Sequence, residues 1–221
     1  WQQECLAYFS LGKLNSELTL RNLQLERELE VLRNEVNELK RDSSYTERTL
    51  AAKLQELPVL SAHVVGNSIT MRDNYITIDK GAKDGVKPRM GVVCGTGIVG
   101  IVSQVTDNYA VVMSVLNSKS SISCRLRGSR YFGYLHWHGG NVLCATLDDI
   151  PRHANFKLGD AVETSGFSNV FPPGIFVGRI IQIRDSRDGL SYQLMVQLSS
   201  DLANVRDVAV ILNDHDTDLV P

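Results

Sequence analysis

The stretch VGIVSQVTD, from Val99 to Asp107, returns as VGRIIQIRD from Val177 to Asp185. Both follow the pattern V-G-x-[IV]-x-Q-[IV]-x-D, and both contain the alternation of half-buried strands. Related hairpins precede them, PRMGVVCGTGIVG in the first case and FKLGDAVETSG…IFVG in the second. The distance from Val99 to Val177 is too long for a solenoid period and predicts two similar small barrels, although chance alternation of strand residues would reproduce some of the pattern.

Segments typical of short strands continue through the chain after Pro58. They are rich in β-branched residues, are separated by Gly, Asp, Asn and Pro, and have no helical patterns of roughly 10 to 15 residues between them. This favours small barrels or sandwiches over a parallel α/β sheet. We therefore predict a mainly β protein with an N-terminal α-helical coiled coil at 1–57, a first β-barrel at 58–130, a second β-barrel at 131–213 and an acidic tail at 214–221.

The second repeat carries an insertion that the first lacks. Met90-Gly91 and Val99-Gly100 lie nine positions apart in the first repeat, whereas Leu158-Gly159 and Val177-Gly178 lie nineteen positions apart in the second. The extra segment includes FSNVFPPG and amounts to ten positions by this comparison. We expect a longer loop there, stiffened by its two prolines.

The insertion has two interpretations. Pro173-Gly174 suits the centre of a type II turn, and Pro172 keeps Phe171 extended. In one interpretation Phe171 and Phe176 close the end of the second barrel. In the other, the segment offers a preordered apolar patch to a partner, with the candidate residues Phe171, Pro172, Pro173 and Phe176.

The first forty residues have a leucine heptad pattern, which predicts a parallel coiled-coil dimer. Asparagines at two successive a positions and attractive charge pairs between e and g positions favour a dimer over the alternative, a single amphipathic helix lying on its own domain. Pro58 ends the helical pattern. The predicted dimerisation residues are Leu11, Asn15, Leu18, Asn22, Leu25, Leu29, Leu32, Val36 and Leu39.

Composition narrows the function classes. The 221 residues are 43% hydrophobic, enough for a sizeable core, and the net charge of −2 without a basic tract argues against nucleic-acid binding. The longest apolar runs are far shorter than the ~20 residues of a membrane helix. Because the chain begins at Trp1 rather than Met, we expect a fragment whose upstream segment has been removed. Cys94, Cys124 and Cys144 are expected as buried small residues, with a disulfide among them as the alternative.

Several motifs invite a chemical interpretation. The sequence GTGIVG, from Gly95 to Gly100, matches a dinucleotide fingerprint but leads into a strand, so we interpret it as a turn. His63, Asp107 and Ser165 occur in the chymotrypsin order, yet Ser165 lacks the G-D-S-G context of that nucleophile. A two-barrel chymotrypsin-like hydrolase carried on a coiled coil is therefore the alternative function.

Metal sites are weakly indicated. His136 and His138 lie two residues apart on one strand face, as zinc ligands can, but no third ligand is evident nearby. The acidic segment DHDTD, Asp214 to Asp218, lacks the glycine and glutamate of a calcium loop. We predict no catalytic residues, no cofactor and no metal.

An ordered series of motifs resembles the MreC family of rod shape-determining proteins. After the leucine-rich segment come NYITIDKGAKDGVKPRMGVV from Asn74 to Val93, then GIVGIVSQV, LDDIPRHANFKLGDAVETSG and VFPPGIFVGRI. The order of these motifs is more specific than any one of them. The chain departs from commoner members at GFSNVF, where a GLGG-like turn is usual.

The resemblance implies a bacterial inner-membrane protein with one N-terminal transmembrane helix, missing here, a coiled coil and two barrels on the periplasmic face. It also implies a non-enzymatic scaffold of the cell-wall elongation machinery that binds and positions or activates an elongation-specific class B penicillin-binding protein. The associated membrane and cytoskeletal partners would be MreD, MreB and RodA. The barrels of this family are similar to those of chymotrypsin-type proteases without the catalytic residues.

Overall fold

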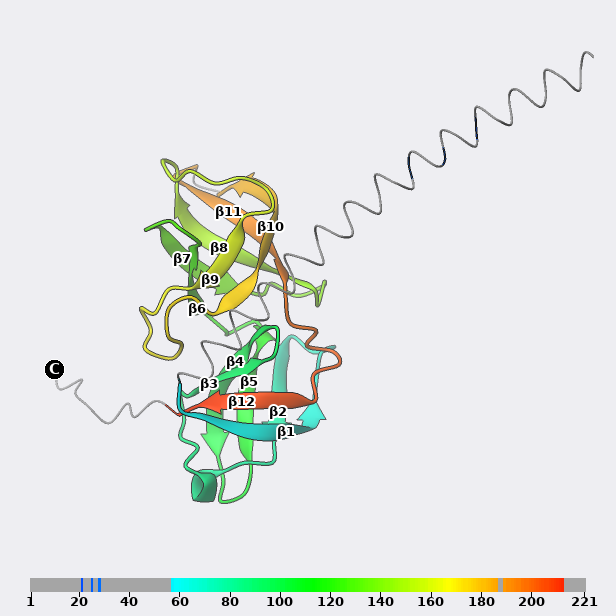
Figure 1. Cartoon of the computed structure of the whole chain (residues 1–221), viewed down its shortest axis with the longest axis vertical. Coiled ribbons are helices and arrows are strands. Elements are labelled where there is room, and N and C mark those ends of the chain that lie inside the picture. The colour runs from blue at the N-terminus through cyan, green and yellow to red at the C-terminus, as the bar shows by residue number, and fades with distance from the viewer. Residues whose placement is uncertain (1–20, 22–24, 26–27, 29–56, 187–188, 213–221) are drawn as a thin grey trace, which may run out of the picture. The chain divides into compact units, whose positions relative to one another are not determined.

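The computed structural model describes Arg21, Leu25, Glu28 and residues 57–186 and 189–212. The strands and the one short 3-10 helix (η1) of these ranges are drawn in Figure 1. In chain order they are β1 (Val59–Asn67), β2 (Asp73–Ile78), η1 (Ala82–Asp84), β3 (Gly91–Cys94), β4 (Gly97–Val105), β5 (Ala110–Asn117), β6 (Ile122–Leu126), β7 (Phe132–His136), β8 (Cys144–Pro151), β9 (Ala161–Thr164), β10 (Phe176–Asp185), β11 (Ser191–Leu198) and β12 (Asp207–Ile211).

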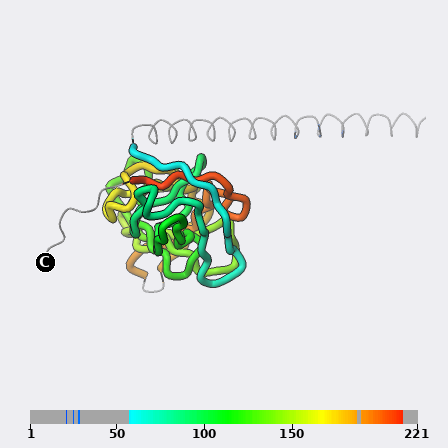
Figure 2. Tube along the Cα trace, turned by 90° about the horizontal axis from the view of Figure 1, so that it is seen from below, coloured from blue at the N-terminus to red at the C-terminus, as the bar shows by residue number. Residues whose placement is uncertain are grey.

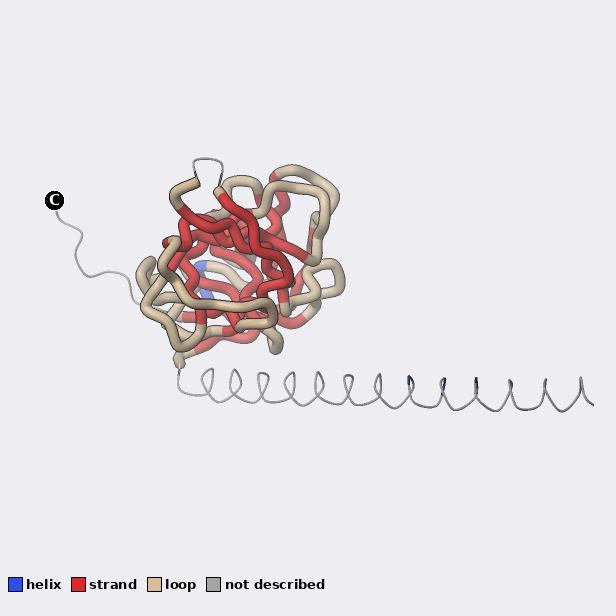
Figure 3. Tube along the Cα trace, turned by 90° about the horizontal axis from the view of Figure 1, so that it is seen from above, coloured by secondary structure: helices blue, strands red, loops and turns tan. Residues whose placement is uncertain are grey.

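The strands form two closed antiparallel barrels, as the sequence predicts. The first has the strand order β1-β12-β3-β4-β5-β2 and the second β10-β11-β8-β7-β6-β9. In Figure 3 the strands of the second barrel, drawn in red, curve around a common interior. Every second side chain of a strand points into its barrel. In β2, for example, Asn74, Ile76 and Ile78 are fully buried, while the residues between them are half-buried. The buried apolar residues of both barrels form one contiguous cluster.

The predicted boundary between the barrels at residue 130 is wrong. β6 precedes residue 130 and yet belongs to the second barrel, where it pairs with β7 and β9. β12 follows the second barrel in sequence but pairs with β1 and β3 and so closes the first, as Figures 1 and 2 show. Without β12 the first barrel would expose two strand edges. The second barrel is therefore inserted into the first.

The predicted repeat is confirmed in the pairing register. In β4, Val102 pairs with Val112 and Gln104 with Val111, so Ser103 forms a bulge. At the equivalent place in β10, Ile180 pairs with Val196 and Gln182 with Met195, so Ile181 forms the corresponding bulge. The shared bulge position shows that the two hairpins follow one structural plan.

One glycine in each repeat lies too close to the neighbouring strand to be replaced by a residue with a side chain. A Cβ at Gly100 would collide with the carbonyl oxygen of Met113 on β5, and a Cβ at Gly178 would collide with that of Gln197 on β11. The strand backbones approach too closely for any other residue. The V-G pair of both repeats is thus required by the fold.

The insertion in the second repeat is shorter than the comparison of glycine landmarks indicates. Val92 pairs with Gly100, eight positions further along the chain, whereas Val162 pairs with Gly178, sixteen positions further along. The extra length is therefore eight positions and not ten. In the first barrel only Gly95 and Thr96 join the two strands. In the second barrel residues 165–175 do so, and we call this segment the inserted loop.

The chain divides into two compact units, Trp1–Tyr45 and Thr46–Pro221, and both barrels belong to the second. Apart from Leu25, the predicted dimerisation residues lie outside the described residues, as does the acidic tail. Arg21, Leu25 and Glu28 are helical and exposed, Leu25 to 50%. Among the residues that the structure describes, no helix combines the length and apolar character needed to cross a bilayer.

Candidate partner-binding surface

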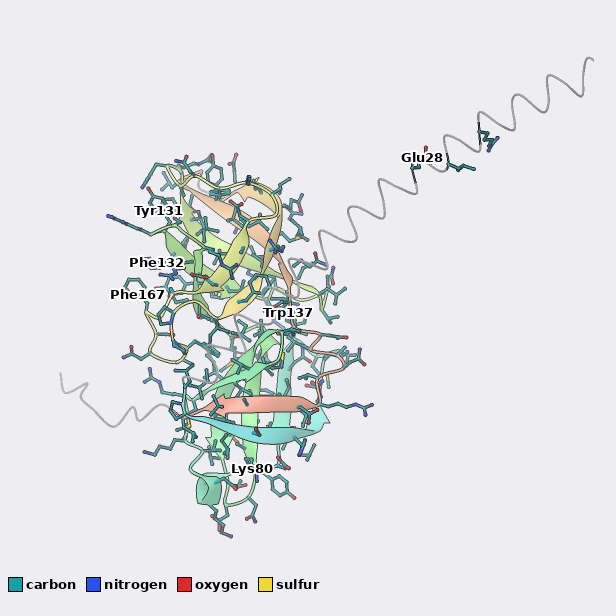
Figure 4. The ribbon with its side chains drawn as sticks, viewed as in Figure 1. Glu28, Lys80, Tyr131, Phe132, Trp137 and Phe167 are labelled. Atoms are coloured by element: carbon teal, nitrogen blue, oxygen red, sulfur yellow. The ribbon has the colours of Figure 1, made fainter. Side chains whose placement is uncertain are left out.

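Three exposed aromatic side chains lie together on the outside of the second barrel. Phe132 and Tyr134 come from β7 and Phe167 comes from the inserted loop, and they are 38%, 42% and 71% exposed. The ring centroids of Phe132 and Phe167 are 4.5 Å apart, and those of Phe132 and Tyr134 are 6.5 Å apart in an edge-on arrangement. Figure 4 shows Phe132 and Phe167 on the same side of the barrel. We call this trio the aromatic surface.

Strand alternation in β7 explains why two of these rings face solvent. Gly133 and Leu135 point into the barrel and are buried, so Phe132 and Tyr134 must point outward. A polar residue is the usual choice at such outward positions of a half-buried strand. Two adjacent outward aromatic residues therefore suggest a function other than folding.

Charged side chains border the aromatic surface. Arg125 of β6 lies opposite Phe132 in the pairing register, and Glu163 of β9 lies opposite Arg125. Arg125 Nε donates to Glu163 Oε1 at 2.9 Å, and Arg127 Nε donates to Oε2 at 3.2 Å. Glu163 is 8% exposed and each arginine 37%. One carboxylate thus serves two guanidinium groups, which leaves a net positive charge beside Phe132.

The inserted loop is held at its base by hydrogen bonds. The Thr164 hydroxyl donates to the Pro172 carbonyl at 2.6 Å and accepts from the Ile175 amide at 2.9 Å. On the other side, the Ser165 hydroxyl donates to that of Ser123 on β6 at 2.7 Å. These bonds fix the base of the loop, and the Phe167 amide is joined to that base by a 3.2 Å bond to Ser165 Oγ, so that the remaining freedom of Phe167 lies in the few residues between Ser165 and Pro172.

The arrangement is suited to binding a protein. Exposed aromatic rings with an arginine beside them are the composition enriched at the centres of protein–protein interfaces. Because the loop is anchored before a partner arrives, little conformational entropy would be lost on binding. The aromatic surface is therefore the candidate site for a protein partner.

The family model described as rod shape-determining protein MreC, barrel core, matches residues 64–212. The chain belongs to the MreC family. The cell shape-determining protein MreC of Listeria monocytogenes is 28% identical over 216 residues, which are 92% of this chain and 73% of that protein. MreC of Streptococcus pneumoniae is 27% identical over 168 residues, which are 74% of this chain and 62% of that protein.

Solved structures of MreC share the fold. One from Listeria monocytogenes has a TM-score of 0.66 and 29% identity, covering 84% of this chain and 90% of its own. A structure described as the major periplasmic domain of the MreC filament has a TM-score of 0.61 and 24% identity, covering 69% and 94%. A complex between a penicillin-binding protein, PBP2, and MreC from Helicobacter pylori gives 0.53 and 18%, covering 70% and 99%. The last two show the fold alone.

The structure of this MreC family member corrects the predicted apolar patch. Phe171 is 2% exposed and Phe176 is 8% exposed, so both are packed inside the protein. The guanidinium groups of Arg127 and Arg179 both lie over the Phe176 ring, 5.5 and 5.8 Å from its centroid. The two prolines contribute little surface: Pro172 is half-buried and only Pro173 is exposed.

Phe167 is the exposed aromatic residue of the insertion, and sequence reasoning missed it. Its neighbours Gly166 and Ser168 are typical of a surface turn, whereas Val170 and Phe171 form an apolar pair. That contrast was the available signal. By contrast, the prediction that Gly174 turns the chain is confirmed by its φ of 86°.

The hydrolase alternative is not supported for this MreC chain. His63 Nδ1 lies 2.7 Å from Asp207 Oδ1, and Asp107 Oδ2 lies 3.5 Å from Lys83 Nζ. Ser165 belongs to the second barrel and is hydrogen bonded to Ser123. The three candidate residues thus have three different partners, whereas a triad requires them to bond to one another.

Neither the histidine pair nor the cysteines form a site. The rings of His136 and His138 are 6.3 Å apart, and within the described ranges no three metal-ligating side chains come together. Cys94, Cys124 and Cys144 are free thiols, so the disulfide alternative fails. Burial raises the pKa of Cys124 far above its usual value, which keeps that thiol protonated.

Proposed function

We propose that this MreC chain is an extracytoplasmic scaffold that binds an elongation-specific class B penicillin-binding protein and positions it for wall synthesis. The observation that carries the proposal is the shared fold with the MreC chain found in complex with PBP2 in Helicobacter pylori. The relative described as a periplasmic domain supports the extracytoplasmic location. Family membership supports the role in cell shape.

The aromatic surface is the contact that we propose for this partner. Phe132 is an exposed aromatic ring that lies next to two others, Tyr134 and Phe167, and Arg125 gives the surface a polar rim. Hot spots of protein interfaces are enriched in such residues, and each contributes about 2 kcal/mol or more. No reaction is assigned to the chain. Its effect on the transpeptidase would come from preferential binding to one conformation of that enzyme.

Two further elements of the proposal rest on the family resemblance and on the heptads. The leucine seam from Leu11 to Leu39 would join two copies in parallel, and a membrane anchor upstream would place the dimer at the inner membrane. MreD, MreB and RodA would associate with the scaffold there. Higher assemblies of dimers are compatible with this arrangement.

Binding to the extracytoplasmic domain of the transpeptidase from the same organism tests the proposal. We expect micromolar or tighter binding by titration calorimetry, weakened about thirtyfold or more by Phe167→Ala, because about 2 kcal/mol corresponds to that factor. Leu158→Ala is the matched control, since Leu158 is 58% exposed but does not belong to the aromatic surface. The proposal is wrong if the unmodified chain does not bind at hundreds of micromolar.

A further inference from the structure

The inserted loop contacts both barrels through two residues close together in sequence. Phe167 stacks on Phe132 of the second barrel at 4.5 Å. Phe171 instead lies against Gly91, the first residue of β3 in the first barrel: a Cβ built on Gly91 would be 2.7 Å from Phe171 Cε1 and 2.7 Å from the Val170 carbonyl. The few residues between these contacts link the first barrel to the aromatic surface.

Gly91 is a glycine because of Val170 and Phe171 of the inserted loop and not because of its own barrel. Its φ lies outside the left-handed range, so its backbone accepts other residues. By the register of the repeat, Val92 corresponds to Val162, and Gly91 therefore corresponds to Ala161, which has a Cβ in the equivalent strand. The barrel frame accepts alanine here. Only Val170 and Phe171 of the inserted loop require glycine at position 91.

The burial pattern of the loop supports a link between the two contacts. Val170 and Phe171 are 6% and 2% exposed, whereas Phe167 is 71% exposed. The base of the loop is hydrogen bonded to Thr164 and Ser123, so a displacement of Phe171 cannot be absorbed there. It must pass to the residues between Phe167 and Phe171. Residues 167–171 are thus the shortest covalent path between the contact with Gly91 and the aromatic surface.

We infer that Phe171 is a positioning residue for the aromatic surface: its contact with Gly91 fixes where the inserted loop holds Phe167. The inference rests on the proposed function, because it assigns a control to the same surface. A change in the contact between the barrels would move Phe171, and the stacking of Phe167 on Phe132 would change with it. By linkage, a partner that binds the stacked rings would strengthen the contact between the barrels.

A fluorine label tests this link without any partner. With 4-fluorophenylalanine in place of Phe167, the ¹⁹F resonance reports the stacking on Phe132. We expect Phe132→Ala, Gly91→Ala and Phe171→Leu each to move this resonance toward that of the unfolded chain. Gly95→Ala is the matched control, since it lies in the same hairpin and its added Cβ would meet nothing within 4 Å. It should leave the resonance unchanged.

Rescue separates positioning from general damage. In Gly91→Ala/Phe171→Leu the smaller side chain makes room for the new methyl group on the side of the ring, while the Val170 carbonyl stays in place, so the resonance should return part of the way from its position in Gly91→Ala. The inference is overturned if Phe132→Ala moves the resonance while Gly91→Ala and Phe171→Leu, both folded by their melting curves, do not.

Titration with the transpeptidase domain completes the experiment. We expect Gly91→Ala to weaken binding about tenfold and Gly95→Ala to change it less than twofold. If the resonance responds as expected but the unmodified chain does not bind the transpeptidase, the link between Phe171 and the aromatic surface stands and the proposed function fails. If binding is tight and Gly91→Ala changes neither binding nor the resonance, the proposed function stands and the link fails.

Discussion

Arg89 and Gly159 occupy the same position in the two barrels, and both have left-handed backbone conformations, with φ of 70° and 87°. The Arg89 amide donates to the Val102 carbonyl and the Gly159 amide to the Ile180 carbonyl, both at 2.8 Å. A side chain costs roughly 1 kcal/mol or more in this conformation, and glycine avoids that cost. The first barrel therefore carries a backbone strain that the second avoids.

Reciprocal substitutions should show this strain. Arg89→Gly should raise the free energy of unfolding by up to about 1 kcal/mol, and Gly159→Ala should lower it by about 1 kcal/mol. Both positions are exposed, and a Cβ at Gly159 would meet nothing within 4 Å, so packing does not confuse the comparison. Urea unfolding measures both changes. Shifts of the same sign in the two variants would contradict the explanation.

Phe171 and Phe167 should respond in opposite ways to truncation. Phe171→Ala removes a buried ring and should cost about 3 kcal/mol or more of stability. Phe167→Ala removes an exposed ring and should change stability by less than about 0.5 kcal/mol. Thermal unfolding of the two variants decides the matter. Equal losses would mean that Phe167 is packed in solution and is not available to a partner.

Asp84 should make the first barrel sensitive to acid. The Gly81 amide donates to Asp84 Oδ2 at 3.0 Å and holds the pKa of that carboxyl below its usual value, and Lys80 acts in the same direction. Lys80 is labelled in Figure 4. Because the folded-state pKa is depressed, the stabilisation is present above the unfolded value of about 4 and is lost as the pH falls through the folded value.

Melting temperatures of Asp84→Asn measure this effect. The variant should melt earlier than the unmodified chain at pH 7, and the difference should begin to shrink near pH 4, where the carboxyl of the unfolded chain becomes protonated, and vanish as the pH falls through the lower pKa of the folded state. Asp107→Asn is the control, since it loses only an exposed pair with Lys83 at 3.5 Å. A difference that persists unchanged at pH 2 would show that the carboxylate charge is not responsible.

The heptad seam predicts a dimer that depends on Leu25. Proline at this position would remove a helix hydrogen bond and clash with the preceding turn, so Leu25→Pro should be monomeric in sedimentation equilibrium. Gln24→Ala, one residue away and off the seam, should leave the dimer intact. A monomeric mass for the unmodified chain at tens of micromolar would exclude the predicted dimer.

Local pattern predicted the strands and the repeat, but barrel closure depends on distant pairing. Gln104 and Gln182 occupy the same place in the sequence repeat. They also occupy the same place in the strand pairing, because each directly follows the bulge of its strand. The boundary at residue 130 failed because β12 returns to the first barrel from far along the chain. The alignment of the two repeats by residue type, which matched Gly91 with Gly159, was wrong by two positions. In the pairing registers Gly159 is equivalent to Arg89.

The candidate surface was predicted incompletely. The insertion was identified as the functional difference between the repeats, yet its exposed residue is Phe167 and not Phe171. Two phenylalanines four positions apart in one loop give similar sequence signals, and which one is buried depends on where β3 of the other barrel lies. Phe132 joins the surface from β7, and both β8 and β9 separate it from the inserted loop along the chain, so only folding creates this proximity.

The insertion of the second barrel into the first has a mechanical consequence. The Leu212 amide donates to the Pro58 carbonyl at 2.8 Å, so the two points where the chain enters and leaves the double barrel are neighbours on β12 and β1. A force that pulls those points apart would act first on the Val59↔Ile211 pair of β1 and β12. The following antiparallel pairs would then separate one after another. The second barrel, with its aromatic surface, lies outside this load path and would stay folded while the first begins to open.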